Sequence, residues 1–65
     1  MRTDEELFKI IEQLETIRDS NPDLFTTEHG YLLHAIKEAN EPHITPESRK
    51  QLLTDLEFIM KKLAL

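Results

Sequence analysis

The sequence contains no cysteine and only one glycine, and its longest apolar runs are three residues. Without cysteine, no disulfide, thiol nucleophile or thiolate metal site can form. One glycine is too few for a glycine-rich phosphate-binding loop. The apolar runs are far shorter than a membrane-spanning helix requires. Because the acidic N-terminal stretch also lacks the apolar run of a signal peptide, we expect a cytoplasmic protein.

Basic residues are scarce in the first two thirds of the chain. Up to Glu41 there are ten acidic residues against four basic ones, whereas from Pro42 onward there are three against four. The net charge of −5 therefore arises in residues 1–41. This excess of acidic groups disfavours direct binding to nucleic acid or to an anionic membrane surface. It favours a partner protein with a basic surface.

The length of 65 residues corresponds to one small domain, residues 1–65. A chain of this size hides only about 60% of the surface that its unfolded form exposes, so its core is small. Since no disulfide supports that core, stability has to come from well-formed helix packing or from self-association.

The clearest structural pattern predicts a helix over residues 46–64. Thr45 is a good N-cap residue, and Pro46 at the first helical position has the φ angle that a helix needs. Apolar residues follow at helical spacing and form one stripe. The stripe consists of Leu52, Leu56, Ile59 and Leu63, with Leu53 and Met60 at its edges.

Two further helices are predicted, over residues 4–20 and 27–40. Thr3 and Glu6 have the spacing of a capping box, and Thr26 or Thr27 is expected to cap the second helix. The connectors are short, so neighbouring helices should run antiparallel. We therefore predict an all-α fold, a small antiparallel three-helix bundle.

The first connector and the single glycine carry two more expectations. Leu24 and Phe25 are too apolar for a free loop, so we expect them to cover the open end of the core. Gly30 lies near the start of the second helix, where it costs up to about 1 kcal/mol relative to alanine. We therefore expect it to mark a close approach of another helix.

The residue types that carry catalysis or bind metals are not in suitable positions. His29 and His34 would point about 140° apart on their helix, whereas a helical zinc site uses histidines four residues apart. The carboxylates are most simply read as a solvated surface, because catalytic carboxylates need a cleft that shifts their pKa values. We predict no catalysis, no metal and no cofactor.

Phe58 breaks the apolar pattern of its helix, since it points about 200° away from Leu56. An aromatic side chain on the outer face suggests a contact with another protein. The predicted contact residues are Phe58, Leu65, Thr54 and Lys61 on this face, with Phe8 and Tyr31 nearby.

The most economical interpretation is a small acidic protein–protein interaction module of regulatory, inhibitory or adaptor type. Such chains resemble in type the small helical regulators of bacteria and phages, a likeness that assigns no residue a role. One alternative is a homodimer, a structural protein that works through the predicted third helix. Another is an acidic mimic that occupies the nucleic-acid-binding cleft of a partner. Phe58 also has two readings without a partner: a core that surrounds the third helix, or simple exposure.

Overall fold

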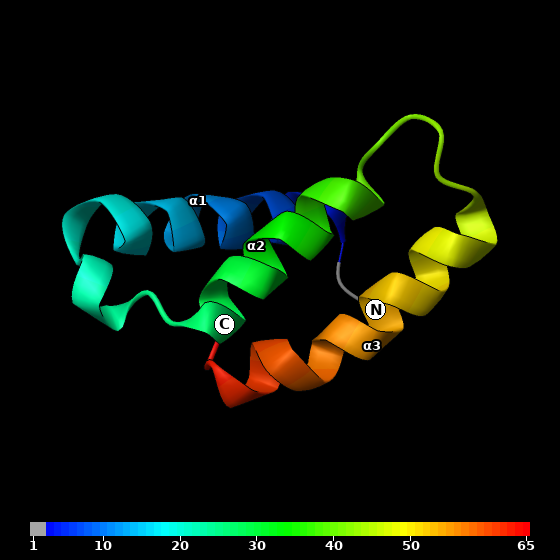
Figure 1. Ribbon diagram of the computed structural model, residues 1–65. Helices are drawn as coiled ribbons and strands as arrows, with labels where there is room; N and C mark the ends of the chain where they lie inside the picture. The colour runs from blue at the N-terminus through cyan, green and yellow to red at the C-terminus, as the bar shows by residue number, and fades with distance from the viewer. Residues whose placement is uncertain (1–2) are drawn as a thin grey trace.

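The computed structural model describes residues 3–65, which form three α-helices, one 3₁₀ turn and no strand (Figure 1). The helices are α1 (Asp4–Ser20), α2 (Thr27–Ala39) and α3 (Pro46–Lys62), and the 3₁₀ turn η1 (Pro22–Leu24) follows α1. The all-α three-helix bundle predicted from the sequence is therefore confirmed. α2 and α3 end one and two residues earlier than predicted, because Asn40 and Leu63 leave the helical conformation.

Each helix begins at a threonine whose hydroxyl accepts a backbone N–H of the first turn. Thr3, Thr26 and Thr45 accept from the residues three positions later, at 3.2, 3.3 and 3.1 Å. Such caps satisfy amides that have no partner within the helix. At α2 the cap is reciprocal, because His29 Nδ1 accepts the backbone N–H of Thr26 at 3.1 Å. The structure thus selects Thr26, and not Thr27, as the cap of α2.

α2 is the central helix of the bundle. It packs against both α1 and α3, whereas α1 and α3 do not approach each other closely along their backbones in the part of the chain described (Figure 1). The core is formed by apolar side chains from the three helices. They are Leu7, Ile10, Leu14, Leu32, Leu33, Ala35, Ile36, Ala39, Leu53, Leu56 and Met60.

The buried side of α3 is rotated slightly from the predicted stripe. Leu53 and Met60, expected at the edges, are as deeply buried as Leu56. The remaining members of the stripe are half-buried: Leu52, Ile59 and Leu63. Helical periodicity predicts which face turns inward, but the position of the neighbouring helices decides which edge of that face is covered.

The first connector matches its prediction in one of its two apolar residues. Phe25 is partly buried and packs against the core, whereas Leu24 is 60% exposed. The ring of Phe25 is also the nearest neighbour of Gly30, where a Cβ atom would make an ordinary contact with it at 3.5 Å. The expectation that Gly30 marks a close helix approach is therefore wrong, since its near neighbour is an aromatic side chain.

The end of α3 reverses direction over its last residues. Ala64 has a φ angle of 59°, in the left-handed region. The N–H of Leu65 donates to the carbonyl of Met60 at 2.9 Å, and the N–H of Ala64 donates to that of Lys61 at 3.1 Å. These two bonds define a Schellman motif, which usually brings an apolar residue back onto the helix. Here it brings Leu65 onto the core.

Candidate functional site

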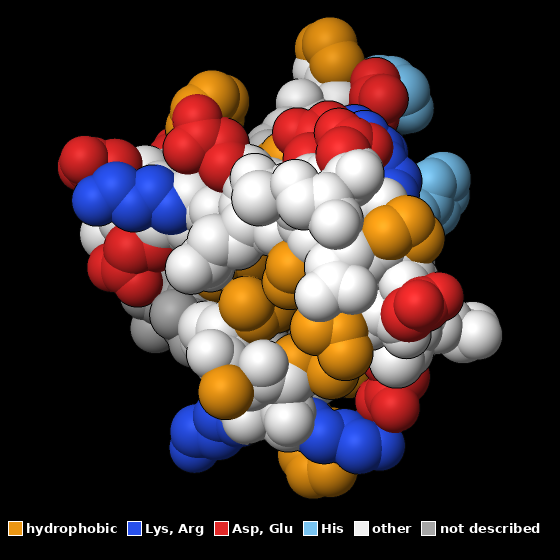
Figure 2. Space-filling view, turned by 90° about the vertical axis from the view of Figure 1, so that its left-hand side faces the viewer, with side chains coloured by type: hydrophobic (Ala, Val, Ile, Leu, Met, Phe, Trp, Pro, Cys, Tyr) orange, Lys and Arg blue, Asp and Glu red, His pale blue; other side chains and the backbone are white. Residues whose placement is uncertain are grey.

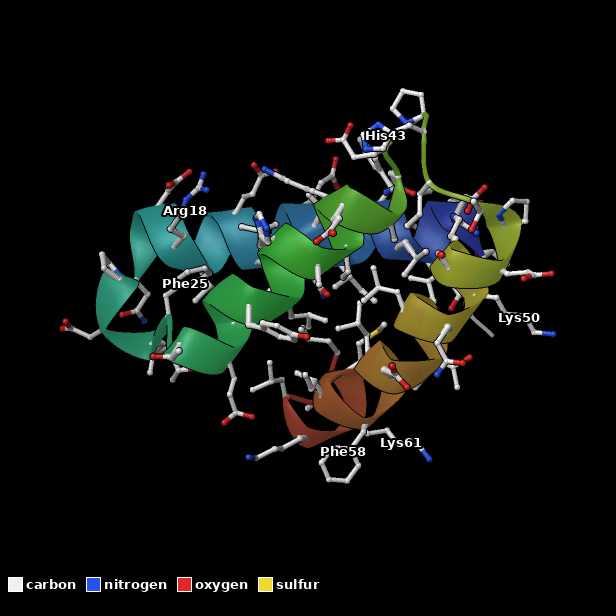
Figure 3. The ribbon with its side chains drawn as sticks, turned by 45° about the vertical axis from the view of Figure 1, so that its right-hand side comes forward. Arg18, Phe25, His43, Lys50, Phe58 and Lys61 are labelled. Carbon is white, nitrogen blue, oxygen red and sulfur yellow. The ribbon has the colours of Figure 1, made fainter. Side chains whose placement is uncertain are left out.

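The candidate site is the outer face of α3, which we define as Lys50, Thr54, Phe58 and Lys61. Successive members are four, four and three residues apart, so they share one side of the helix. All four are exposed, and Phe58 is the most exposed large apolar residue described, at 75%. Figure 3 shows the side chains of Phe58 and Lys61 pointing away from the bundle together.

The two lysines of this face are available for a partner. Neither ammonium group has a hydrogen bond or ion pair with any residue in the described range. The hydroxyl of Thr54 donates to the carbonyl of Lys50 at 2.8 Å, so it is already used within the helix. The face therefore offers one aromatic ring and two free positive charges.

The other charged side chains at the helix interfaces are mostly paired within the chain. Ion pairs link α1 to α2, α2 to α3 and α1 to α3. They are Lys37–Glu15 at 3.3 Å, Lys62–Glu28 at 3.0 Å and Arg49–Asp4. Because these cations have partners, Lys62 does not add to the outer face of α3, although it follows Lys61 in the sequence.

Leu65 does not belong to this face, and its predicted position beside Phe58 is wrong. The prediction assumed that the helix continues through residue 64, but α3 ends at Lys62. The left-handed conformation of Ala64 then turns Leu65 back toward the core. It lines a groove together with side chains of α1, including Ile17.

Phe8 and Tyr31 are exposed, at 62% and 56%, but they lie on other helices. Phe8 is on α1 and Tyr31 is on α2. No contact among the described residues joins either side chain to Phe58. The exposed aromatic residues are therefore separate points on the surface, and Phe58 is the one that lies between free lysines.

Sequence reasoning missed the groove between α1 and the C-terminal residues. It has a volume of about 660 Å³ and is lined by Lys9, Glu12, Gln13, Thr16, Ile17 and Leu65. The usual signal for the chain reversal that forms it is a glycine or asparagine after the helix. Alanine occupies that position here, so no residue type in the sequence indicates the reversal.

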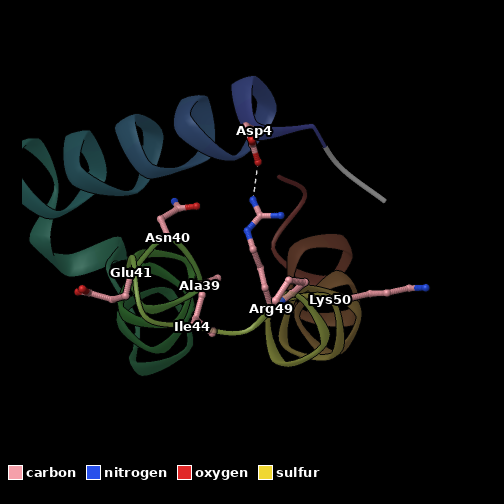
Figure 4. A pocket seen from close by; sticks show the side chains of 8 residues that line it. Asp4, Ala39, Asn40, Glu41, Ile44, Arg49 and Lys50 are labelled. Atoms are coloured by element: carbon pink, nitrogen blue, oxygen red, sulfur yellow. Dashed lines mark hydrogen bonds and ion pairs between the residues drawn. The ribbon is translucent and has the colours of Figure 1, made fainter.

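A second hollow lies at the connector between α2 and α3 (Figure 4). Its volume is about 480 Å³, and Ala39 and Ile44 contribute apolar surface. Arg49 and Lys50 supply positive charge, but the guanidinium group of Arg49 is paired with the carboxylate of Asp4. The carboxylate of Asp4 already occupies this guanidinium group, which is the strongest anion-binding group of the hollow. The hollow is therefore a weak candidate for a ligand site.

Two other features considered from the sequence are a metal site and a membrane-spanning helix. Between residues 3 and 65 there is no group of three or more acidic, histidine or cysteine side chains placed to hold a metal ion. None of the helices in this range is long and apolar enough to cross a membrane. Arg18 donates to Asp19 at 3.1 Å, and this side-chain hydrogen bond raises the pKa of Arg18.

Comparison with known proteins gives no further guide to the site. The chain matches no family model, and no curated protein or solved structure is significantly similar to it. Its function therefore has to be argued from its own geometry.

Proposed function

We propose that this chain is a non-catalytic protein–protein interaction module of regulatory, inhibitory or adaptor type, and that it docks through the outer face of α3. One observation carries the proposal: Phe58 is 75% exposed between two lysines that have no partner in the described part of the chain. Aromatic side chains are enriched at the centres of protein contacts, whereas charged side chains lie mainly at their polar rim.

The local charge of the face indicates the chemistry of its partner. The whole chain carries −5, which favours a basic partner for the acidic surface of α1. At physiological ionic strength, however, charges more than about 8 Å apart at the surface are largely screened. A partner that contacts Phe58 is therefore met chiefly by Lys61, three residues away, because Lys50 lies eight residues away, about 12 Å along the helix. We propose that it presents an apolar pocket edged by acidic side chains.

The absence of buried polar groups supports a function without catalysis. Within residues 3–65, no polar or charged side chain is buried. Catalytic acids and bases are usually sheltered, because a sheltered environment shifts their pKa values toward the working pH. The absence of cysteine also fits action in a reducing compartment, and we propose the cytoplasm.

The experiment compares two charge substitutions, Phe58→Glu and Phe8→Glu. Both replace an exposed phenylalanine on a helix with the same acidic residue, so Phe8→Glu is a matched control. Each tagged variant and the wild type capture proteins from the native lysate, which are quantified by mass spectrometry. We expect both variants to keep the helical circular dichroism of the wild type.

The proposal predicts proteins that wild type and Phe8→Glu capture and Phe58→Glu loses. Truncation of an aromatic anchor often costs about 2 kcal/mol or more of binding free energy, and a buried charge adds to that loss. Identical capture by the three proteins would show that the outer face of α3 is not the docking surface. Unfolding of Phe58→Glu alone would show that Phe58 stabilises the fold instead.

A further inference from the structure

We infer that the chain binds a second copy of itself, with Phe58 of one copy inserted into the groove between α1 and Leu65 of the other. The inference rests on the proposed function, since it names a second copy as a partner of the outer face of α3. It joins two features that the fold keeps apart: an exposed aromatic side chain and an apolar groove.

The groove suits an aromatic ring in size and in chemistry. Its volume of about 660 Å³ lies within the range of pockets that accept small ligands. Ile17 and Leu65 are both half-buried and supply its apolar surface. Figure 2 shows apolar side chains gathered at the centre of one face of the molecule. Burial of a phenylalanine ring in the groove would remove apolar surface of both copies from water.

The groove carries one acidic side chain with no partner among the described residues, whereas the outer face of α3 carries lysines without one. Glu12 lines the groove, and its carboxylate has no ion pair or hydrogen bond with a described residue. The adjoining hollow on α1 adds Glu15 and Asp19, but Glu15 is paired with Lys37 and Arg18, and Asp19 is paired with Arg18. Lys9, the one cation among the described lining residues, lies 3.9 Å from Glu5. Glu12 is therefore the acidic group of the groove that is left to complement Lys61 beside Phe58.

A single copy cannot make this contact within itself. The apolar stripe of α3 faces the core, and Phe58 lies on the opposite side of the helix (Figure 3). The groove lies against α1, whose backbone is not close to α3 in the described residues. The ring and the groove must therefore come from different molecules. Charge complementarity identifies the second copy as the occupant, because each copy carries Lys61 beside Phe58 and Glu12 in its apolar groove.

The first test measures self-association by sedimentation equilibrium over a wide range of protein concentration, at low and at high salt. We expect an average mass that exceeds that of the monomer and rises with protein concentration. The association should be weaker at high salt, so the rise in mass should be smaller there. Phe58→Glu should weaken the association more than about tenfold. Thr16→Arg, which puts a long cation into the groove from an exposed position, should do the same. Phe8→Glu should associate as the wild type does.

The second test mixes the two damaged proteins. Phe58→Glu retains an intact groove, and Thr16→Arg retains an intact Phe58. Each should be monomeric alone, and the mixture should form a heterodimer through the one contact that remains. In a separate pair, Glu12→Lys and Lys61→Glu should each weaken self-association, and the double variant should recover it because the charges are exchanged across the contact.

Three results would overturn the inference: a monomer at every concentration, self-association that survives both Phe58→Glu and Thr16→Arg, or a mixture that stays monomeric. The proposed function is tested separately by capture from the lysate. If the chain is monomeric but Phe58→Glu still loses a captured protein, the self-association fails and the docking face stands. If Phe58→Glu changes neither measurement, both proposals fail.

Discussion

Replacing Ala64 by glycine should stabilise the protein, although glycine usually weakens a fold. Ala64 has a φ of 59°, which the Schellman motif at the end of α3 requires. A residue with a side chain loses about 1–2 kcal/mol in this left-handed region, whereas glycine adopts it freely. Glycine loses more conformational freedom on folding, which costs about 0.5–1 kcal/mol relative to alanine. The difference leaves a net stabilisation of about 0.5–1 kcal/mol.

A thermal melt followed by circular dichroism measures this effect. For a domain of this size, the gain corresponds to a rise in Tm of about 2–8 °C. Ala39→Gly is the control with the opposite expected sign, because Ala39 is helical and buried in the core, so its replacement should lower the stability by about 1 kcal/mol or more. If Ala64→Gly also lowered the Tm, the chain would not reverse at residue 64. Leu65 would then not line the groove next to Ile17.

Three further predictions concern the core, the glycine and metal binding. Leu56→Ala should lower the free energy of unfolding by about 2–5 kcal/mol, because Leu56 is only 1% exposed; an unchanged melting midpoint would show that it is not in the core. Gly30→Ala should raise that free energy by up to about 1 kcal/mol, since the added Cβ makes an ordinary contact with Phe25; a lower midpoint in chemical denaturation would contradict this. Calorimetry with zinc should show no stoichiometric binding, and one tight zinc per chain that is lost in His29→Ala would refute that expectation.

The helices were predictable because each has a local signal for its start and a periodic apolar face. Thr3, Thr26 and Thr45 cap the helices by contacts within one turn, which depend on nearby sequence alone. The exposure of Phe58 followed from its angle on α3 relative to Leu56, and the structure places it on the outside.

The features that were not predictable depend on residues far apart or on an unusual conformation. Gly30 is close to the ring of Phe25, a contact made by the path of the connector and not by helix spacing. The position of Leu65 depends on Ala64 adopting a conformation that alanine rarely has. The groove joins Ile17 to Leu65, two residues from opposite parts of the chain, so no local pattern could indicate it.

The central claim is that the outer face of α3 is the contact surface, and fluorine NMR tests it most directly. The chain contains three phenylalanines: Phe8 and Phe58 are exposed on different helices, and Phe25 is partly buried. Fluorinated phenylalanine therefore labels the proposed contact together with two internal references.

The labelled chain is titrated with its own unlabelled chain and, separately, with a protein captured from the lysate. We predict that the Phe58 resonance shifts or broadens in at least one titration, while the Phe8 resonance stays unchanged. A Phe58 resonance that remains constant in both titrations, while Phe8 responds, would contradict the account and place the contact on α1.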